Sequence, residues 1–301
     1  MTTLRDSPTR LAWQRRAESL IRTWRAFAHS RSGLAGLGIL AFFVGVALLA
    51  PVLADRSGLN LTTAPGRPLE GPSTHFWLGT DQNGRSILTL LMYGARVSLF
   101  VGVLATAISV VLGTTIGLAS GHFRGFVGSA LFRLTEWFLV IPFLPLAIVL
   151  ASLLGPSLFN TSLVIGVTGW ASTAVLIRSQ TLTIETRPYL ERARVLGGGH
   201  WHQMTRQVLP NVMPMVLANT TLTVAVSILT ETTLSFLGLG GSNTISWGYI
   251  LEQAFQLGSA TNGLWWFFIP PGICVVATVL AFTLVGRALE DVLNPRTRSR
   301  R

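Results

Sequence analysis

The 301-residue sequence contains no lysine, only one cysteine and few charged residues. Without lysine the chain can form neither a P-loop nucleotide site nor a lysine Schiff base, because both need that amine. The lone Cys274 excludes an intrachain disulfide and a cysteine-based metal cluster. Charged residues make up 12% of the chain, against about 25% in a typical soluble domain. These absences exclude an ATPase and indicate a membrane protein, and no catalytic or metal-binding residues are expected.

Half of the residues are hydrophobic, and they gather in long runs. A transmembrane helix needs about 20 mostly apolar residues. The sequence therefore predicts an all-α membrane protein with six transmembrane helices, at Gly33–Ala54, Val97–Ser120, Leu134–Leu154, Leu158–Ile177, Val212–Leu237 and Leu264–Val285. The first run is expected to be an uncleaved span, because it is longer than the apolar part of a signal peptide and 32 residues precede it.

The arginines alternate between the segments that separate these runs. Seven precede the first run, two follow the second, five follow the fourth and five lie at the C-terminal end. The remaining four all lie between the first and second runs. Because positive charge stays on the cytoplasmic side, both termini are expected in the cytoplasm, and the basic balance indicates membrane topology rather than nucleic-acid binding. The expected division is a basic tail (1–32), a first span (33–54), an external segment (55–96), a transmembrane core (97–290) and a second cytoplasmic tail (291–301).

Glycines and prolines mark packing and bends inside the runs. Gly113, Gly117 and Gly121 recur every four residues, which predicts close approach of a neighbouring helix to the second span. Pro142 and Pro145 should kink the third span, because each removes a helix hydrogen bond.

The end of the external segment has an apolar helical face, formed by Ile87, Leu90, Leu91 and Tyr93. This pattern predicts a separate interfacial helix that lies on the outer membrane surface. In the third run, Arg133 and Glu136 are spaced to pair on one helix face.

The fifth run carries a polar stripe, Asn219, Thr223, Ser227, Thr230 and Glu231. Polar side chains within a membrane face protein or water, so the stripe is interpreted as the wall of a hydrated translocation path, with interhelical hydrogen bonding as the alternative. A proton-relay role for Glu231 or Glu136 would instead indicate a proton-coupled secondary transporter. A membrane enzyme is disfavoured, because neither H-E-x-x-H nor G-x-S-x-G occurs.

The cytoplasmic segment 187–210 has the pattern of two short amphipathic helices joined by Gly197–Gly199. Pro188 suits a first helical turn, and Glu191 complements the helix dipole and is expected to pair with Arg194. Apolar residues share one face of each helix, namely Leu190, Ala193 and Leu196 in the first and Trp201, Met204 and Val208 in the second. The second helix is expected to end near Pro210. A surface helix lying against lipid headgroups is the alternative interpretation.

The run from Tyr189 to Gly197, with Val208–Asn211 after it, resembles the EAA loop of ABC importer permeases. That loop couples the permease to its ATPase. The matching positions are Glu191, Ala193, Gly197, Leu209 and Pro210, with Leu196 in the same helix. The sequence departs from the pattern at Arg192, where alanine is usual, and at Gln207, where isoleucine is typical.

Three further blocks are similar to the dipeptide/oligopeptide/nickel permeases, in particular to the C-type partner of a permease pair. They are Leu78–Arg85, which includes Gly79, Thr80, Asp81, Gly84 and Arg85, then Tyr93–Arg96 and Leu234–Gly240. Asn294–Arg296 resembles a further signature at the C-terminal end. Taken alone, Asp81 and Arg85 could be only a capped turn and an i, i+4 pair.

The resemblance implies a type I ABC importer transmembrane fold in the plasma (inner) membrane of a bacterium. It implies a homologous permease subunit, two ATPase subunits that hold ATP and Mg, and an extracytoplasmic substrate-binding protein. No cofactor is expected on this chain. The cargo stays open among dipeptides, oligopeptides and nickel chelates.

Overall fold

The computed structural model describes residues 21, 24–61, 63–241 and 244–293. Five long helices form its frame: α2 (Arg31–Leu53), α3 (Ile87–His122), α6 (Leu158–Glu185), α9 (Leu209–Phe236) and α11 (Trp265–Leu293). The shorter elements are the 3₁₀ turn η1 (Arg56–Leu59), α4 (Phe126–Val140), α5 (Phe143–Leu154), α7 (Pro188–Val195), α8 (His200–His202), the π-helical turn η2 (Gln203–Val208) and α10 (Trp247–Gln256).

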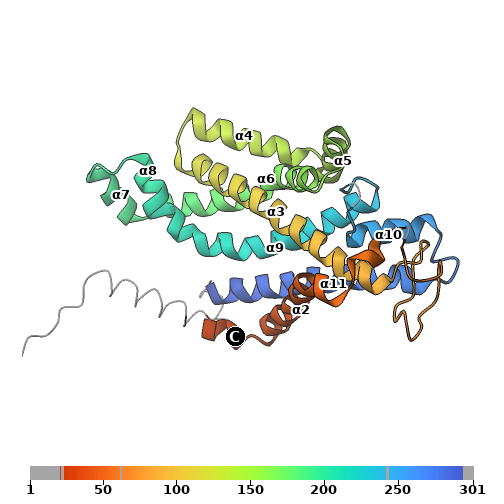
Figure 1. Ribbon diagram of the computed structural model, residues 1–301. Coiled ribbons are helices and arrows are strands. Elements are labelled where there is room, and N and C mark those ends of the chain that lie inside the picture. The colour runs from red at the N-terminus through yellow and green to blue at the C-terminus, as the bar shows by residue number, and fades with distance from the viewer. Residues whose placement is uncertain (1–20, 22–23, 62, 242–243, 294–301) are drawn as a thin grey trace, which may run out of the picture.

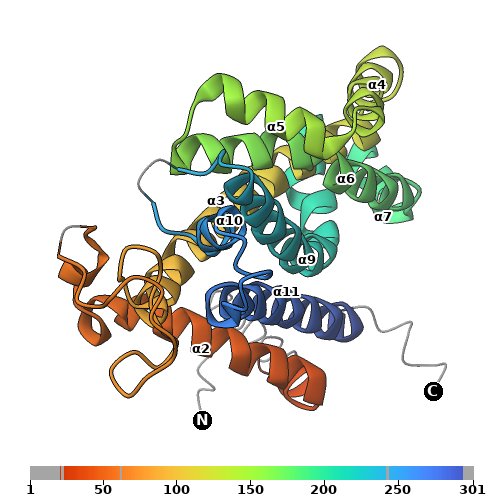
Figure 2. The same cartoon turned by 90° about the vertical axis from the view of Figure 1, so that its right-hand side faces the viewer.

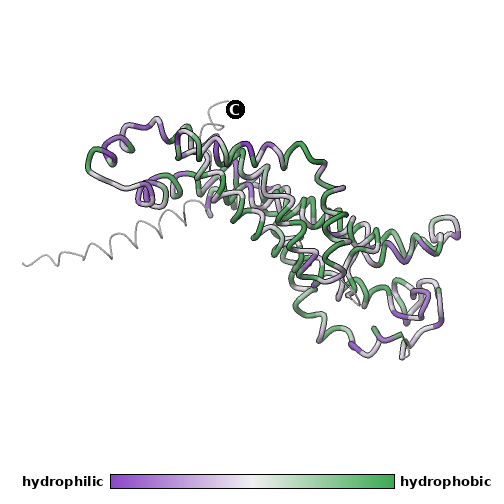
Figure 3. The backbone as a smooth tube through the Cα atoms, turned by 90° about the horizontal axis from the view of Figure 1, so that it is seen from above, coloured by the Kyte–Doolittle hydropathy of each residue, from purple (hydrophilic) through white to green (hydrophobic). Residues whose placement is uncertain are grey.

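The helices form an elongated bundle in which α3, α6 and α9 lie between two outer layers (Figures 1 and 2). The pair α4 and α5 covers one side, and α2 with α11 covers the other. Apolar residues line the length of the bundle, and hydrophilic segments gather toward its two ends (Figure 3). The short helices α7 and α8 lie at one end, and the loop before α3 lies at the other. An all-helical membrane fold is therefore confirmed.

The glycine stripe of α3 packs against α6, as the four-residue spacing predicts. A Cβ on Gly117 would lie 2.6 Å from the carbonyl oxygen of Ala174. Gly113 contacts Thr173, and Gly121 contacts Thr181, in the same close manner. The contact positions rise together along both helices, so α3 and α6 run parallel.

The parallel seam requires the chain to return from the inner end of α3 to the outer end of α6. The elements α4 and α5 make this return, and they are bent by 90° at their break. This bent pair takes the place of the kinked span expected at Leu134–Leu154: the break falls at Pro142, as the prolines predict, and only the start differs, because the first helix begins at Phe126. Pro142 precedes the first residue of α5, and Pro145 falls within its first turn, where the missing N–H is tolerated. Among the described residues, five helices are long and apolar enough to span a membrane alone, and counting the bent α4–α5 pair as one span gives six.

The separate interfacial helix expected near Ile87 is also wrong, because α3 runs without a break for 36 residues. Its first turns are buried by protein rather than by lipid headgroups. Leu90 is 1% exposed and shares a cluster with Trp247, the fully buried first residue of α10. The indole N–H of Trp247 donates to the carbonyl of Leu91 at 3.1 Å. The external helix α10 was not predicted from the sequence, and it is what covers this face.

Trp265 and Trp266 begin α11 at its outer end, where an aromatic belt is expected. Most of the basic tail 1–32, the end of the tail 291–301 and the Asn294–Arg296 signature lie outside the described residues.

Gly117→Ala should destabilise the subunit, because its methyl group must displace the backbone of α6; overpacking of this kind costs about 1–3 kcal/mol. Gly272→Ala in α11 is the matched control, since a Cβ there meets nothing within 4 Å. Thermal unfolding of detergent-purified protein measures both variants. A melting temperature for Gly117→Ala equal to or above that of Gly272→Ala would contradict the seam.

Candidate functional site

The loop 187–210, predicted to be cytoplasmic, begins with α7, whose first turn contains Pro188. The helix ends at the glycines: Gly197 has φ +82°, a backbone conformation that favours glycine, and the N–H of Gly198 donates to the carbonyl of Ala193 at 2.9 Å. The next helix starts directly after Gly199. The hinge expected at Gly197–Gly199 therefore lies between two helices, as the sequence predicts.

The second helix does not end near Pro210, and that expectation is wrong. Helical structure continues from His200 to Phe236, so α8, η2 and α9 form one long element. The N–H of Leu209 bonds to the carbonyl of Met204, five residues earlier. This wide π turn is followed at once by Pro210, which has no N–H to contribute and sits in the first turn of α9. A motion of the loop would therefore reach α9 directly.

The loop buries one apolar residue and exposes several others. Leu190 is fully buried against Val208 and Val212 and fixes α7 to the bundle. Val195, Leu196 and Trp201, here called the apolar patch, are 87%, 86% and 77% exposed. The expectation that Leu196 shares the buried face of Leu190 is therefore wrong, because Leu196 is the C-cap residue and points away from the bundle surface.

The other predicted residues of the loop flank this patch. Glu191 and Arg192 are exposed, Ala193 is half-buried, Leu209 is half-buried and Pro210 is exposed. Exposed apolar residues in the same loop as an exposed glutamate and arginine have the composition of a protein-docking surface.

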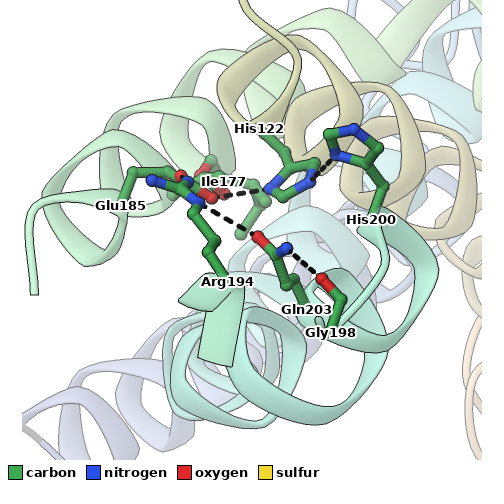
Figure 4. Close-up of polar contacts among 8 residues, drawn as sticks. His122, Ile177, Glu185, Arg194, Gly198, His200 and Gln203 are labelled. Atoms are coloured by element: carbon green, nitrogen blue, oxygen red, sulfur yellow. Dashed lines mark hydrogen bonds and ion pairs between the residues drawn. The ribbon is translucent and has the colours of Figure 1, made fainter. Parts of the chain in front are cut away.

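Arg194 does not pair with Glu191, as the spacing suggested, but with Glu185 at the end of α6 (Figure 4). Its Nε also donates to Oε1 of Gln203 at 3.2 Å. Glu185 is only 7% exposed, so it attracts the guanidinium more strongly than the exposed Glu191 does.

Glu185 is the centre of a buried polar network that sequence reasoning missed (Figure 4). Its Oε1 lies 2.6 Å from Nδ1 of His122, the last residue of α3. Nε2 of His122 lies 3.0 Å from Nδ1 of His200. The amide of Gln203 donates to the carbonyl of Gly198 at 2.5 Å. No motif links these residues in the sequence: the parallel packing of α3 and α6 brings His122 to Glu185, and the fold of the loop adds Arg194, His200 and Gln203.

No metal ion is implied at this network. Among the described residues, no three His, Cys, Asp or Glu side chains are placed to hold one. Each imidazole nitrogen named above faces a hydrogen-bond partner instead.

A cavity of about 400 Å³ lies at the break between α4 and α5, where α3, α6 and α9 meet it. Three residues of the predicted polar stripe line it: Asn219, Thr223 and Ser227. The amide of Asn219 donates to the hydroxyl of Thr173, while the buried hydroxyl of Ser109 has no partner in the described structure. The lining is hydroxyl, amide and apolar, and sequence reasoning missed its contributions from the neighbouring helices: Ser109, Phe138, Leu139, Ile141, Pro142, Phe143, Ile165, Thr168, Gly169, Ala171, Ser172 and Thr173.

The structure places Thr230 and Glu231 outside this cavity lining. Glu231 is 1% exposed and accepts hydrogen bonds from Ser98 at 2.9 Å and from Ser235 at 2.7 Å. The Ser98 hydroxyl in turn accepts the backbone N–H of Trp247 at 3.3 Å. Glu231 therefore braces α3, α9 and α10 against one another, which is the interhelical alternative considered for the stripe.

The second carboxylate considered for proton transfer, Glu136, lies on the surface of α4. It pairs with Arg133 at 3.1 Å, as the spacing predicts, and the two side chains are 38% and 76% exposed. A pair of this kind contributes little to stability.

The external block forms a capped turn closed by an ion pair. Asp81 Oδ2 lies 2.7 Å from Nε of Arg85, and both side chains are buried. Oδ1 of Asp81 accepts the backbone N–H groups of Asn83 and Arg85, each at 2.8 Å. Thr80 bonds to the backbone of Arg67 and Glu70. Gly79 and Gly84 have φ values of +68° and +75°, and both lie against neighbouring backbone. These five residues hold the loop in shape.

Comparison with known proteins gives two family matches. Residues 113–299 match the model described as the binding-protein-dependent transport system inner membrane component. Residues 19–68 match the N-terminal transmembrane domain of oligopeptide transport permease C.

Individual relatives extend the likeness over almost the whole chain. The dipeptide transport system permease protein DppC of Bacillus subtilis is 34% identical, covering 91% of this chain and 85% of the relative. The di/tripeptide transport system permease protein DppC of Pseudomonas aeruginosa is 34% identical over 92% of both chains. The glutathione transport system permease protein GsiD of Pectobacterium atrosepticum is 29% identical over 98% of this chain and 95% of the relative.

Glu231→Leu should lower thermal stability, because it leaves the buried hydroxyls of Ser98 and Ser235 without their acceptor; each such loss costs about 1–3 kcal/mol. Glu231→Gln keeps an acceptor and the shape of the side chain, so its effect should be clearly smaller. Melting temperatures of the two purified variants provide the measurement. Equal stability of wild type and Glu231→Leu would show that Glu231 is not a brace.

Proposed function

Because the chain belongs to the family of inner-membrane components of binding-protein-dependent transport systems, we propose that it forms one half of a peptide translocation path. Membership of this family implies an ATPase and a binding protein as partners. A homologous permease would supply the other half of the path, and two ATPase subunits holding ATP and Mg would bind below. Peptide cargo is supported by the relatives, which are named for dipeptide, di/tripeptide and glutathione transport.

The observation that carries the proposal is the exposed end of the cytoplasmic loop. Val195, Leu196 and Trp201 are exposed in the same loop as the exposed Glu191, and the helices α7 and α8 of this loop lie at one end of the bundle (Figure 1). An exposed patch of this kind on a helix–hinge–helix loop suits insertion into a groove on an ATPase. In this arrangement α7 lies in the cytoplasm, and with six crossings so do both termini, in the plasma membrane of a bacterium.

The path would run along the cavity at the α4–α5 break. Its wall offers hydroxyl and amide groups from Asn219, Thr223 and Ser227, which can replace water around a peptide backbone without selecting a side-chain charge. Irregular backbone at membrane depth is tolerated where it lines such a cavity. The wall therefore suits passage of varied peptides, with selection left to the binding protein.

ATP would act on the path through α7. Closure of the two ATPases would move α7, and the attached spans would rock between inward-facing and outward-facing arrangements. ATP can drive this change only if ATP-bound ATPases fit one arrangement better than the other. In this proposal the chain supplies α7, which moves with the ATPases, and the polar residues that line the path, while its partners supply the nucleotide sites.

Charge reversal at Glu191 should separate ATP hydrolysis from uptake, because it places a positive charge in the docking surface. In a reconstituted complex, Glu191→Arg should lower peptide uptake about tenfold or more, which corresponds to roughly 1.4 kcal/mol of lost coupling. A bulky residue at Gly197 should act similarly, since its φ of +82° resists any other side chain. Glu136→Arg on the surface of α4 is the control. Normal ATP-driven uptake by both loop variants would refute the docking role.

Thr223→Trp should block the path without preventing assembly, because Thr223 lines the cavity and the indole would fill much of it. Leu229→Trp is the matched control, since Leu229 lies on the same helix and is 52% exposed. The measurement is uptake of a labelled dipeptide into proteoliposomes, normalised to the amount of assembled complex. Equal uptake by the two variants would place the path elsewhere.

A further inference from the structure

We propose that Glu185, together with His122 and Arg194, forms the joint that transmits movement of α7 to the membrane-spanning helices. The inference rests on the proposed docking of α7 to an ATPase and adds the residues through which the force leaves that helix. In this joint they act as positioning residues, because they contact neither nucleotide nor cargo.

Glu185 is placed so that its two carboxylate oxygens serve two different elements (Figure 4). Oε1 bonds to His122 at the end of α3, and Oε2 bonds to Arg194 of α7. Glu185 itself is the last residue of α6. Three elements therefore meet at one carboxylate, and none can turn away from the others without breaking a charged hydrogen bond.

The backbone alone does not hold α7 in this position. On one side a two-residue link, Thr186 and Arg187, joins it to α6, and on the other the glycines Gly197–Gly199 give it a flexible connection. Gln203 bridges that flexible side, because it accepts from Arg194 and donates to the carbonyl of Gly198. The side chains thus stiffen a turn that glycine would otherwise leave free.

His122 extends the joint in two directions. It follows Gly121, the last glycine of the seam between α3 and α6, so a push on Glu185 reaches both helices where they are closely packed. Its second nitrogen bonds to His200, which begins the continuous element leading into α9. Movement of α7 therefore reaches α3, α6 and α9 together.

Burial distinguishes this joint from the surface ion pair of α4. Glu185 and His122 are 7% and 4% exposed, and a buried carboxylate that loses a hydrogen-bond partner keeps the cost of its burial uncompensated. The pair of Arg133 and Glu136 is exposed and confined to one helix, so it joins no two elements. Replacing Glu185 and replacing Glu136 each remove one carboxylate, so the two substitutions can be compared directly.

The decisive variant is Glu185→Gln in the complex of both permeases and both ATPases, reconstituted with the binding protein. Glutamine keeps the shape of glutamate but carries no charge and offers one acceptor oxygen where the carboxylate offers two, so the ion pair with Arg194 is lost. ATP hydrolysis should stay within about twofold of wild type, while peptides imported per ATP hydrolysed should fall about fivefold or more, the lower end of typical coupling energies. Glu136→Gln should leave that ratio unchanged.

An unchanged ratio in assembled Glu185→Gln would overturn the joint, even if uptake and hydrolysis fell together, because a purely structural role lowers both in proportion. If Glu185→Gln does not assemble, His122→Asn decides by the same ratio, since it removes the imidazole that bonds to Glu185 and His200 and leaves the ion pair of Glu185 with Arg194 in place. Glu191→Arg tests the underlying function separately. If Glu191→Arg uncouples and Glu185→Gln does not, the joint fails alone; if Glu191→Arg has no effect, the docking role fails.

Discussion

The parallel packing of α3 on α6 is the constraint on which the rest of the structure depends. Three glycines of α3 let the two backbones meet with almost no side chain between them. Parallel helices need a return crossing, so α4 and α5 must traverse the bundle, and their break opens the cavity. The same register brings both inner ends to one level, where His122 meets Glu185. The cavity at the α4–α5 break and the contact of His122 with Glu185 thus both follow from the packing of α3 on α6.

Features encoded by local spacing could be predicted from the sequence. Apolar runs gave the spanning helices, Gly113, Gly117 and Gly121 gave the seam, and Arg133 with Glu136 gave their surface pair. The loop was recognisable because Pro188 starts a helix and Gly197 ends it within a few residues. Three of the five polar positions predicted on α9 line the cavity. The four-residue spacing identifies the helix face that these residues share, but it does not show which neighbouring helix packs against each of them.

Features that depend on partners distant in sequence could not be predicted. Arg194 has Glu191 within reach along its helix, yet it bonds to the more deeply buried Glu185. The apolar face of Ile87 and Leu90 looked interfacial, because nothing in the sequence showed that α10 would cover it. Pro210 looked like a helix end, although the π turn before it lets the helix continue. In each case tertiary contacts outweigh the local pattern.

The central claim is that α7 and the inner ends of α3 and α6 move as one body. Spin labels at Phe126, the first residue of α4 and four residues beyond the end of α3, and at Arg187, the N-cap of α7, would test it in a Cys274→Ser background. The distance between these two labels should stay the same in the nucleotide-free and ATP-bound complex, while the distance from each to a label on the second permease changes. A change in the distance between Phe126 and Arg187 as large as the change across the two permeases would contradict it.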